Sequence, residues 1–215
     1  MSNAKLQDTD VLQQSPVTQV IYRAAREEDC PALAKLYSET FTEFDGMSAG
    51  LPNTHPPYQQ QLWALTHEGP YHYSKATVAE LAGEIIGSVS GMPCSEMQSY
   101  EDLLKFLPEE RIWFLKETFA DLPSDSYFCD KVVVTPHAGG KWVGPRLCSA
   151  FVKKVKEEGW DKLYFYVWGH NEQQQKMYTG RYRAVCLETV AIPENDILPP
   201  EITENHLMCV DLKGK

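Results

Sequence analysis

Residues 127–168 constrain the fold of this chain more than any other stretch, because a helix lies between two apolar strands there. The runs YFCDKVVV and KLYFYVW are both rich in β-branched and aromatic residues. Between them, Leu147, Phe151 and Val155 recur at the spacing of one helical face, and Gly159 marks the expected end of the helix. A strand, a helix and a strand in this order predict a βαβ unit with parallel strands and a right-handed crossover. The chain is therefore expected to form a mixed α/β fold.

The sequence before this unit predicts two further strands in a hairpin and a strand followed by a helix. TQVIYRAAR, at 18–26, has the pattern of a strand, and Asp29 can cap the helix that follows. Residues 76–93 contain two β-rich runs separated near Ala82 and Gly83. This pattern is typical of an antiparallel hairpin.

The remaining segments predict loops, short helices and two final strands. Residues 45–58 carry Gly and Pro and predict a loop, followed by a short helix in QQQLWALTHEG. Residues 99–126 predict two amphipathic helices broken at Pro108. Asn171 is a good N-cap for a helix that precedes the strands RAVCLETVAI and HLMCVDL.

Composition and charge exclude several classes of function. The formal net charge is −10 and no run of Lys and Arg is present, which disfavours nucleic acid as a partner. The apolar stretches are far shorter than the roughly 18 residues of a membrane span, so no membrane is expected. Six cysteines without CxxC spacing and six histidines without HExxH spacing predict no metal site. A polar N-terminus predicts a cytoplasmic protein, with a flexible segment at 1–18 and one domain at 19–215.

The turn between the first strand and the helix of the βαβ unit contains Gly139, Gly140 and Gly144. A glycine-rich turn that leads into a helix presents backbone N–H groups and the positive end of the helix dipole, so it can hold an anion such as a pyrophosphate. The same glycines also allow a tight crossover from strand to helix. For such a turn alone, the second explanation is the commoner one.

The order of these elements resembles the GNAT superfamily of acyl-CoA-dependent N-acetyltransferases, over nearly the whole chain from about residue 19. In that family a strand ending in Val-x-Pro, here VTP at 134–136, precedes an Arg-Gly-x-Gly-x-Gly turn and a helix. With Gly144 as the last glycine, Gly139 replaces the arginine and Trp142 replaces the second glycine. The resemblance implies a single-domain, mostly antiparallel sheet of about six to seven strands, with helices on both faces and a splayed central parallel pair.

The resemblance also implies an enzyme that transfers an acetyl group from acetyl-CoA to a primary amine by direct attack in a ternary complex. Acetyl-CoA is then a co-substrate, and the acceptor is a small-molecule or protein amine. The protein could be a monomer or a homodimer. The pantetheine arm would follow the first strand of the unit, with the pyrophosphate over the turn. The implied cofactor-binding residues are Val132, Val133, Val134, Gly139, Gly140, Lys141, Trp142, Val143, Gly144, Pro145 and Asn171.

Several of these positions leave two explanations open. Trp142 either turns outward or narrows the pyrophosphate pocket. Lys141 and Arg146 either supply the charge absent at the arginine position or are solvated side chains. Asn171 contacts the pantetheine arm or only caps its helix. The turn departs from the family's pattern at Gly139, at Trp142 and at Pro145, which lacks an N–H. These departures favour one alternative function, a GNAT-fold binding or regulatory module with little catalysis.

Tyr178 matches the family's tyrosine on the helix after Asn171, which implies a general acid for the CoA sulfur. The oxyanion donor is expected to be the backbone N–H of Val134 or Val132. Beyond Tyr178 the chain has Tyr182-Arg183 where the family usually has Gly-Phe.

The general base is the least determined role. Asp130 is a candidate because it lies on the same strand as the implied cofactor segment, upstream of it. Glu80 and Glu84 of the hairpin, and water, are the alternatives. Acceptor specificity is expected to come from the segments 45–58 and 93–126.

Overall fold

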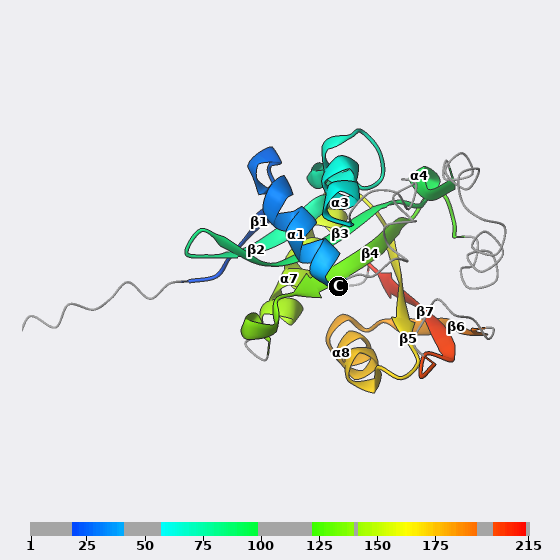
Figure 1. The fold of residues 1–215 in the computed structure, drawn as a ribbon. Helices are drawn as coiled ribbons and strands as arrows, with labels where there is room; N and C mark the ends of the chain where they lie inside the picture. The colour runs from blue at the N-terminus through cyan, green and yellow to red at the C-terminus, as the bar shows by residue number, and fades with distance from the viewer. Residues whose placement is uncertain (1–18, 41–56, 99–121, 140–141, 193–199, 214–215) are drawn as a thin grey trace, which may run out of the picture.

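The computed structural model describes residues 19–40, 57–98, 122–139, 142–192 and 200–213 (Figure 1). Three predicted segments lie largely outside these residues. They are the flexible segment at 1–18, the loop at 45–58 except for its last two residues, and the two helices in 99–126 except for the last five residues. None of the described helices is long and apolar enough to cross a membrane.

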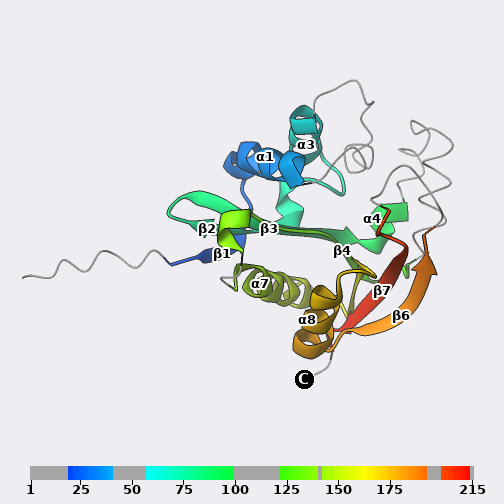
Figure 2. The ribbon, with the colours of Figure 1, turned by 60° about the horizontal axis from the view of Figure 1, so that its bottom comes forward.

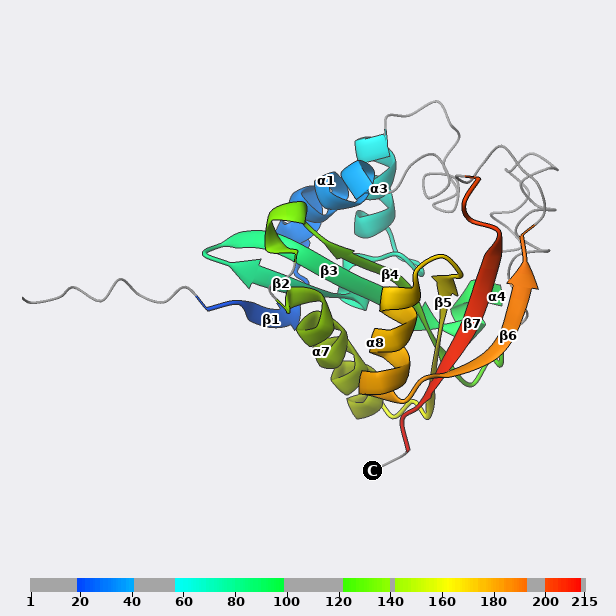
Figure 3. The same ribbon diagram turned by 90° about the horizontal axis from the view of Figure 1, so that it is seen from below.

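The described strands form one sheet in the order β1-β2-β3-β4-β5-β7-β6, with β1 at one edge and β6 at the other (Figure 3). The pair β4 and β5 is parallel, and every other neighbouring pair is antiparallel, which confirms the predicted sheet. The strands are β1 (Ile21–Ala24), β2 (Ala76–Leu81), β3 (Glu84–Pro93), β4 (Tyr127–Val134), β5 (Lys162–Trp168), β6 (Val185–Ala191) and β7 (Glu204–Asp211).

Helices cover both faces of the sheet, as predicted. In Figure 2, α1 and α3 lie on one side of the strands, and α7 and α8 lie on the other. The short α4 directly follows β3 and was not expected from the sequence. The helices are α1 (Cys30–Thr40), α3 (Pro57–Thr66), α4 (Cys94–Gln98), α7 (Val143–Glu157) and α8 (Glu172–Tyr182).

The predicted hairpin joins β2 and β3. Ala82 and Gly83 both have positive φ, 52° and 84°, as a two-residue turn that matches the strand twist requires. Asp29 does not cap α1 directly. It ends a short 3-10 turn before that helix, where its carboxylate accepts the Arg26 N–H at 2.7 Å and pairs with Arg23.

The core on the α7 face of the sheet confirms the helical periodicity found in the sequence. Leu147, Phe151 and Val155 are fully buried there, in one cluster with side chains of β2 to β5 and β7. A second cluster lies on the opposite face, where Leu33 and Tyr37 of α1 pack against the sheet. Among the described residues, apolar clusters therefore cover both faces of the sheet.

Candidate active site

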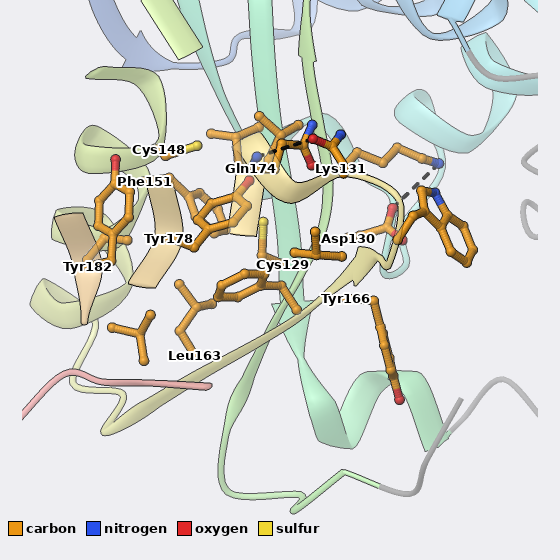
Figure 4. Close-up of a pocket in the computed structure, with 18 residues that line it drawn as sticks. Cys129, Asp130, Lys131, Cys148, Phe151, Leu163, Tyr166, Gln174, Tyr178 and Tyr182 are labelled. Atoms are coloured by element: carbon orange, nitrogen blue, oxygen red, sulfur yellow. Dashed lines mark hydrogen bonds and ion pairs between the residues drawn. The ribbon is translucent and has the colours of Figure 1, made fainter. Parts of the chain in front are cut away.

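The two parallel strands of the βαβ unit separate soon after they begin to pair. Their register contains only Tyr127 with Leu163 and Phe128 with Tyr164. Beyond these pairs the strands diverge, and a cavity of about 220 Å³ opens between them (Figure 4). The residues that line it are Val89, Cys129, Asp130, Lys131, Val132, Cys148, Phe151, Val152, Leu163, Phe165, Tyr166, Val167, Trp168, Asn171, Gln174, Tyr178, Tyr182 and Val210.

A β-bulge at Asp130 marks the start of this separation. On the β3 side, Ser90 lies opposite Lys131 and the next residue, Gly91, lies opposite Cys129, so Asp130 is an extra residue in β4. An extra residue reverses the alternation of a strand. Side chains that would have pointed to the α7 face now point to the α1 face. Lys131 is the first of them.

Lys131 is a buried cation on the α1 face, and no pattern in the sequence identified it as a site residue. Its side chain is 5% exposed, and its Nζ lies 3.5 Å from Asp130 Oδ2. The same Nζ lies 4.9 Å from the centre of the Tyr71 ring and 5.8 Å from that of Tyr37. The only available signal was two adjacent charges inside an otherwise apolar strand, YFCDKVVV.

Tyr178 projects from α8 into the cavity, where Cys148 of α7 and Cys129 of β4 also point (Figure 4). Its ring packs on Phe165, with centroids 4.5 Å apart. Burial raises the pKa of the Tyr178 phenol strongly, and the two neighbouring thiols raise it further. Burial also raises the pKa of Cys148, to about 11. The phenol therefore keeps its proton at neutral pH and can act as a donor. The two cysteines were not predicted to belong to the site.

The backbone of β4 offers N–H groups to the gap. Thr135 donates its N–H to the Ile86 carbonyl of β3 at 2.9 Å. Because successive N–H groups of a strand point to opposite edges, those of Val134 and Val132 point toward β5. These are the two residues expected as oxyanion donors, and Val132 also lines the cavity. Val133 instead packs its side chain into the α1-face core.

The glycine turn ends in an unusual backbone conformation at Trp142. This residue has φ 61° and ψ 11°, the left-handed region that favours glycine, and its side chain is 66% exposed. The indole therefore turns outward, which decides between the two expected orientations. Gly139 lies in the described part of the turn, whereas Gly140 and Lys141 lie outside it.

The first turn of α7 presents few backbone donors. Pro145 has no N–H, and the Arg146 N–H donates to the Trp142 carbonyl at 3.2 Å. The N–H groups of Val143 and Gly144, the first two residues of α7, precede the intrahelical ladder and remain to bind an anion. Neither residue lines the cavity itself, which lies further along the cleft.

Two contacts tie α8 to its surroundings. Asn171 caps the helix, since its side chain accepts the Gln174 N–H at 3.2 Å, and it also lines the cavity. Both roles expected for Asn171 are therefore compatible with its position. At the other end, Tyr182 donates its hydroxyl to the Pro145 carbonyl of α7 at 2.5 Å. Tyr182 was expected only as a departure from the family pattern.

The other candidate bases lie elsewhere. Glu80 forms an ion pair with Arg23 at 2.7 Å, and Glu84 lies 3.9 Å from His137. Neither glutamate lines the cavity, whereas Asp130 does. Within the described residues, no group of His, Cys, Asp and Glu side chains could hold a metal ion.

Comparison with known proteins agrees with this geometry. The sequence model of the Acetyltransferase (GNAT) family matches residues 30–181. No curated protein matches the chain. An acetyltransferase of known crystal structure is similar, with a TM-score of 0.66, 19% identity, and 89% of this chain and 99% of the other covered.

Two further solved structures share the fold. An N-acetyltransferase from Staphylococcus aureus Mu50 has a TM-score of 0.62 and 17% identity, with 88% of this chain and 100% of the other covered. The diaminobutyrate acetyltransferase EctA from Paenibacillus lautus, in complex with L-2,4-diaminobutyric acid and coenzyme A, has a TM-score of 0.54 and 13% identity, with 92% and 98% covered. At these identities the structures show a common fold, whereas the family model covers most of the sequence. The chain belongs to the acetyltransferase (GNAT) family.

Proposed function

We propose that the protein is an N-acetyltransferase that transfers the acetyl group of acetyl-CoA to a primary amine by direct attack in a ternary complex. One observation carries the proposal. The parallel strands β4 and β5 separate after two residue pairs and leave a cavity that Tyr178 and Asp130 both line. A tyrosine hydroxyl and a carboxylate in one cavity, in a chain of the acetyltransferase (GNAT) family, support this reaction.

The residues present fit acetyl-CoA as the co-substrate. The N–H groups of Val143 and Gly144 at the start of α7, together with the helix dipole, suit a pyrophosphate. The segment 132–134 and Asn171 would hold the pantetheine arm between the strands. Gly139 follows a 3-10 turn before α7. Because it has no side chain, it would not block a pyrophosphate that approaches the start of the helix. Gly140 and Lys141 remain predicted contacts of the same turn.

Each step of the transfer has a candidate group. The Asp130 carboxylate takes a proton from the acceptor ammonium, and the free amine nitrogen attacks the thioester carbonyl carbon. The N–H of Val132 or Val134 binds the oxygen that gains negative charge. As the C–N bond forms and the C–S bond breaks, the Tyr178 hydroxyl gives its proton to the departing sulfur. The acylated nitrogen then loses its surplus proton to solvent, and solvent returns a proton to the Tyr178 phenolate. Apolar side chains such as Val89, Phe151 and Phe165 form part of the cavity wall and would limit the access of water to the thioester.

Two measurements test the proposal. Acetyl-CoA at a hundred times its dissociation constant should stabilise the protein by about 2.7 kcal/mol, which a thermal shift detects. Release of free thiol from acetyl-CoA should then depend on an added amine from a panel of amines, amino acids and peptides. Stabilisation without amine-dependent thiol release for any acceptor would contradict an N-acetyltransferase.

The alternative is a GNAT-fold binding or regulatory module. It is favoured by Pro145, which removes one backbone donor from the start of α7, and by Trp142, a bulky residue in a left-handed conformation where the family has glycine. This alternative predicts no thermal shift at millimolar acetyl-CoA and no thiol release. The same two measurements therefore separate the two functions.

A further inference from the structure

A second cluster of polar and titratable side chains lies at the β6 edge of the sheet (Figure 3). Cys186 and Thr189 of β6 contact His206 of β7, and His206 in turn contacts Glu204. None of these four residues lines the cavity between β4 and β5. Cys186 is exposed, whereas the other five cysteines of the chain are buried or partly buried. The thiol that is most accessible to a reagent in solution is therefore the one in this cluster.

A β-bulge in β6 brings the cluster to one face of the sheet. Cys186 and Thr189 lie opposite Met208 and His206, which are only two residues apart on β7, so β6 contains one extra residue between them. Without it, positions three apart in a strand would point to opposite faces. Glu204 precedes His206 by two residues and shares its face. The register thus assembles a thiol, a hydroxyl, an imidazole and a carboxylate.

The distances place a base beside the thiol. Thr189 Oγ1 lies 2.9 Å from His206 Nδ1, and Cys186 Sγ lies 3.9 Å from each of these two atoms. On the other side of the ring, Nε2 lies 3.3 Å from Glu204 Oε1. A carboxylate only accepts hydrogen bonds, so it favours the proton on Nε2 and leaves Nδ1 as the proton acceptor that faces the thiol.

The turn after β5 makes room for the carboxylate. A Cβ on Gly169 would collide with the Glu204 side chain. The Gly169 N–H donates to the Glu204 carbonyl at 2.9 Å, which fixes the backbone beside that side chain. The side chain of His206 is only 15% exposed. The imidazole is therefore held in place, and the carboxylate can stabilise the positive charge that the ring gains with a proton.

We propose that Cys186 is a site of reversible S-thiolation, at which its thiol exchanges with a low-molecular-weight disulfide and His206 acts as the base. Nδ1 takes the Sγ–H proton, directly or through the Thr189 hydroxyl, and the Cys186 sulfur attacks one sulfur of the disulfide. The new S–S bond forms as the S–S bond of the disulfide breaks, and the departing thiolate takes the proton from His206. The disulfide is the oxidant, and the products are a mixed disulfide on Cys186 and one free thiol. This site is separate from the cavity and does not depend on the proposed function.

Incubation with hydroxyethyl disulfide, a small uncharged disulfide, tests the proposal. Mass spectrometry of the intact protein at neutral pH follows the addition of mercaptoethanol groups, and peptide mapping locates them. The first addition should occur at Cys186, should be reversed by dithiothreitol, and should be absent from Cys186→Ser. His206→Gln cannot take the proton and should slow this addition by about 10-fold, because an unassisted thiol is only a few per cent ionised at neutral pH. Glu204→Gln keeps the base and should slow it less.

Two variants serve as matched controls, and both should leave the rate of the first addition unchanged. His137→Gln removes a histidine of the turn after β4 that also lies near a glutamate, with Glu84 at 3.9 Å. Cys209→Ser removes a partly buried thiol of β7, the pKa of which is raised by burial. A melting curve of each variant shows whether it is folded.

Two further measurements keep the test decisive if His206→Gln does not fold. His206→Asn is a smaller amide that also cannot take a proton, and it should slow the addition similarly. The wild type itself gives a comparison without any substitution, since in urea the thiol of Cys186 has no base beside it. Cys186 should therefore react about 10-fold faster in the native protein than in the unfolded chain, although folding ordinarily slows the reaction of a thiol.

The outcomes either support or overturn the proposal. Slow addition in a folded His206 variant, together with faster reaction of the native wild type than of the unfolded chain, supports it. Equal rates for the wild type and a folded His206 variant would show that Cys186 is an exposed thiol without a base, which overturns it. A first addition at another cysteine, or a native rate no higher than the rate in urea, overturns it as well.

Discussion

The two ends of β4 differ more than their similar sequences suggest. At the closed end, Tyr127 and Phe128 pair with β5 and are buried. At the open end, from Lys131 to Val134, the strand keeps its pairing with β3 and has no pairing with β5. One inserted residue, Asp130, separates these ends. The change of register within β4 therefore coincides with the change from a paired, buried strand to one that lines the cavity.

Gly91 is the position at which a single change should break this comparison most severely. A Cβ added there would lie 2.3 Å from the Phe128 carbonyl oxygen and 2.8 Å from Phe151 Cζ. We expect Gly91→Ala to lower the free energy of unfolding by about 3 kcal/mol or more, because backbone opposite the bulge must move. Urea unfolding measures the change.

Gly180→Ala is the control of opposite sign. Gly180 lies in α8, and a Cβ there would meet nothing within 4 Å. The free energy of unfolding should rise by up to about 1 kcal/mol, because alanine favours the helix. A Gly91→Ala protein as stable as the wild type would mean that the close approach at the bulge is not required.

Tyr178→Phe should separate chemistry from folding at the open end. The change removes the hydroxyl and keeps the ring on Phe165. If Tyr178 protonates the departing thiolate, kcat should fall by about 10²-fold or more, with little change in Tm. Steady-state kinetics on the best acceptor, with a melting curve on the same sample, measure both. A variant that turns over at the parental rate would remove Tyr178 from the mechanism.

Tyr127→Phe makes the same substitution at the closed end and should have the opposite result. The Tyr127 hydroxyl is buried and donates to the Gly91 carbonyl at 3.0 Å. Its loss leaves that carbonyl without this partner and should cost about 1 kcal/mol of unfolding free energy. We expect kcat to stay within about 3-fold of the parent, which corresponds to a change of about 0.6 kcal/mol in the activation free energy. The reason is that this hydroxyl belongs to the closed end of β4. A large loss of kcat would show that the two ends of β4 do not act independently.

Trp142→Gly should have the smallest effect. Glycine adopts the left-handed conformation of this position without the cost of about 1 kcal/mol that other residues bear, and the exposed indole contributes little packing. The Tm should rise slightly, and acetyl-CoA should bind more tightly because the backbone can approach the pyrophosphate. Trp142→Ala, which keeps the backbone cost, is the control. Equal Tm values for the two variants would show that the conformation carries no strain.

An arginine at Gly139 is a less favourable repair of the same turn. The family has arginine at this position, so the sequence predicts that an arginine would add a contact to the pyrophosphate. A Cβ at Gly139 would lie 3.1 Å from the Pro136 carbonyl oxygen, so the turn must shift to accept it. Gly139→Arg combined with Trp142→Gly should therefore gain less affinity for acetyl-CoA than the added charge alone suggests. Isothermal titration of the single and double variants measures the difference.

The sequence was sufficient for the parts of the fold that depend on periodicity. The bounds of β4 and β5 coincide with the runs YFCDKVVV and KLYFYVW, and the helical face of Leu147, Phe151 and Val155 is buried. These elements are long and regular, so local pattern decides them. α4, with only five residues, gave no such pattern.

Some cavity residues were predictable, Asp130 from its place on the strand and two others because they match the family's motif. Tyr178 and Asn171 were found in this way and both line the cavity. Lys131, Cys129 and Cys148 were missed, because their places depend on which face of a strand or helix meets the gap. For Lys131 that face is reversed by the bulge at Asp130, and a bulge leaves no mark in a strand's composition.

The hydroxyl of Tyr182 has a thermodynamic consequence for the whole cleft. It donates to the carbonyl of Pro145, so the last turn of α8 is bonded to the first turn of α7. One helix carries the expected pyrophosphate site at its start, and the other carries Tyr178 one turn before Tyr182. A ligand that orders the start of α7 should therefore also stabilise α8, the helix that holds Tyr178. By linkage, the factor by which such a ligand favours the ordered α8 should equal the factor by which the ordered α8 favours binding of the ligand.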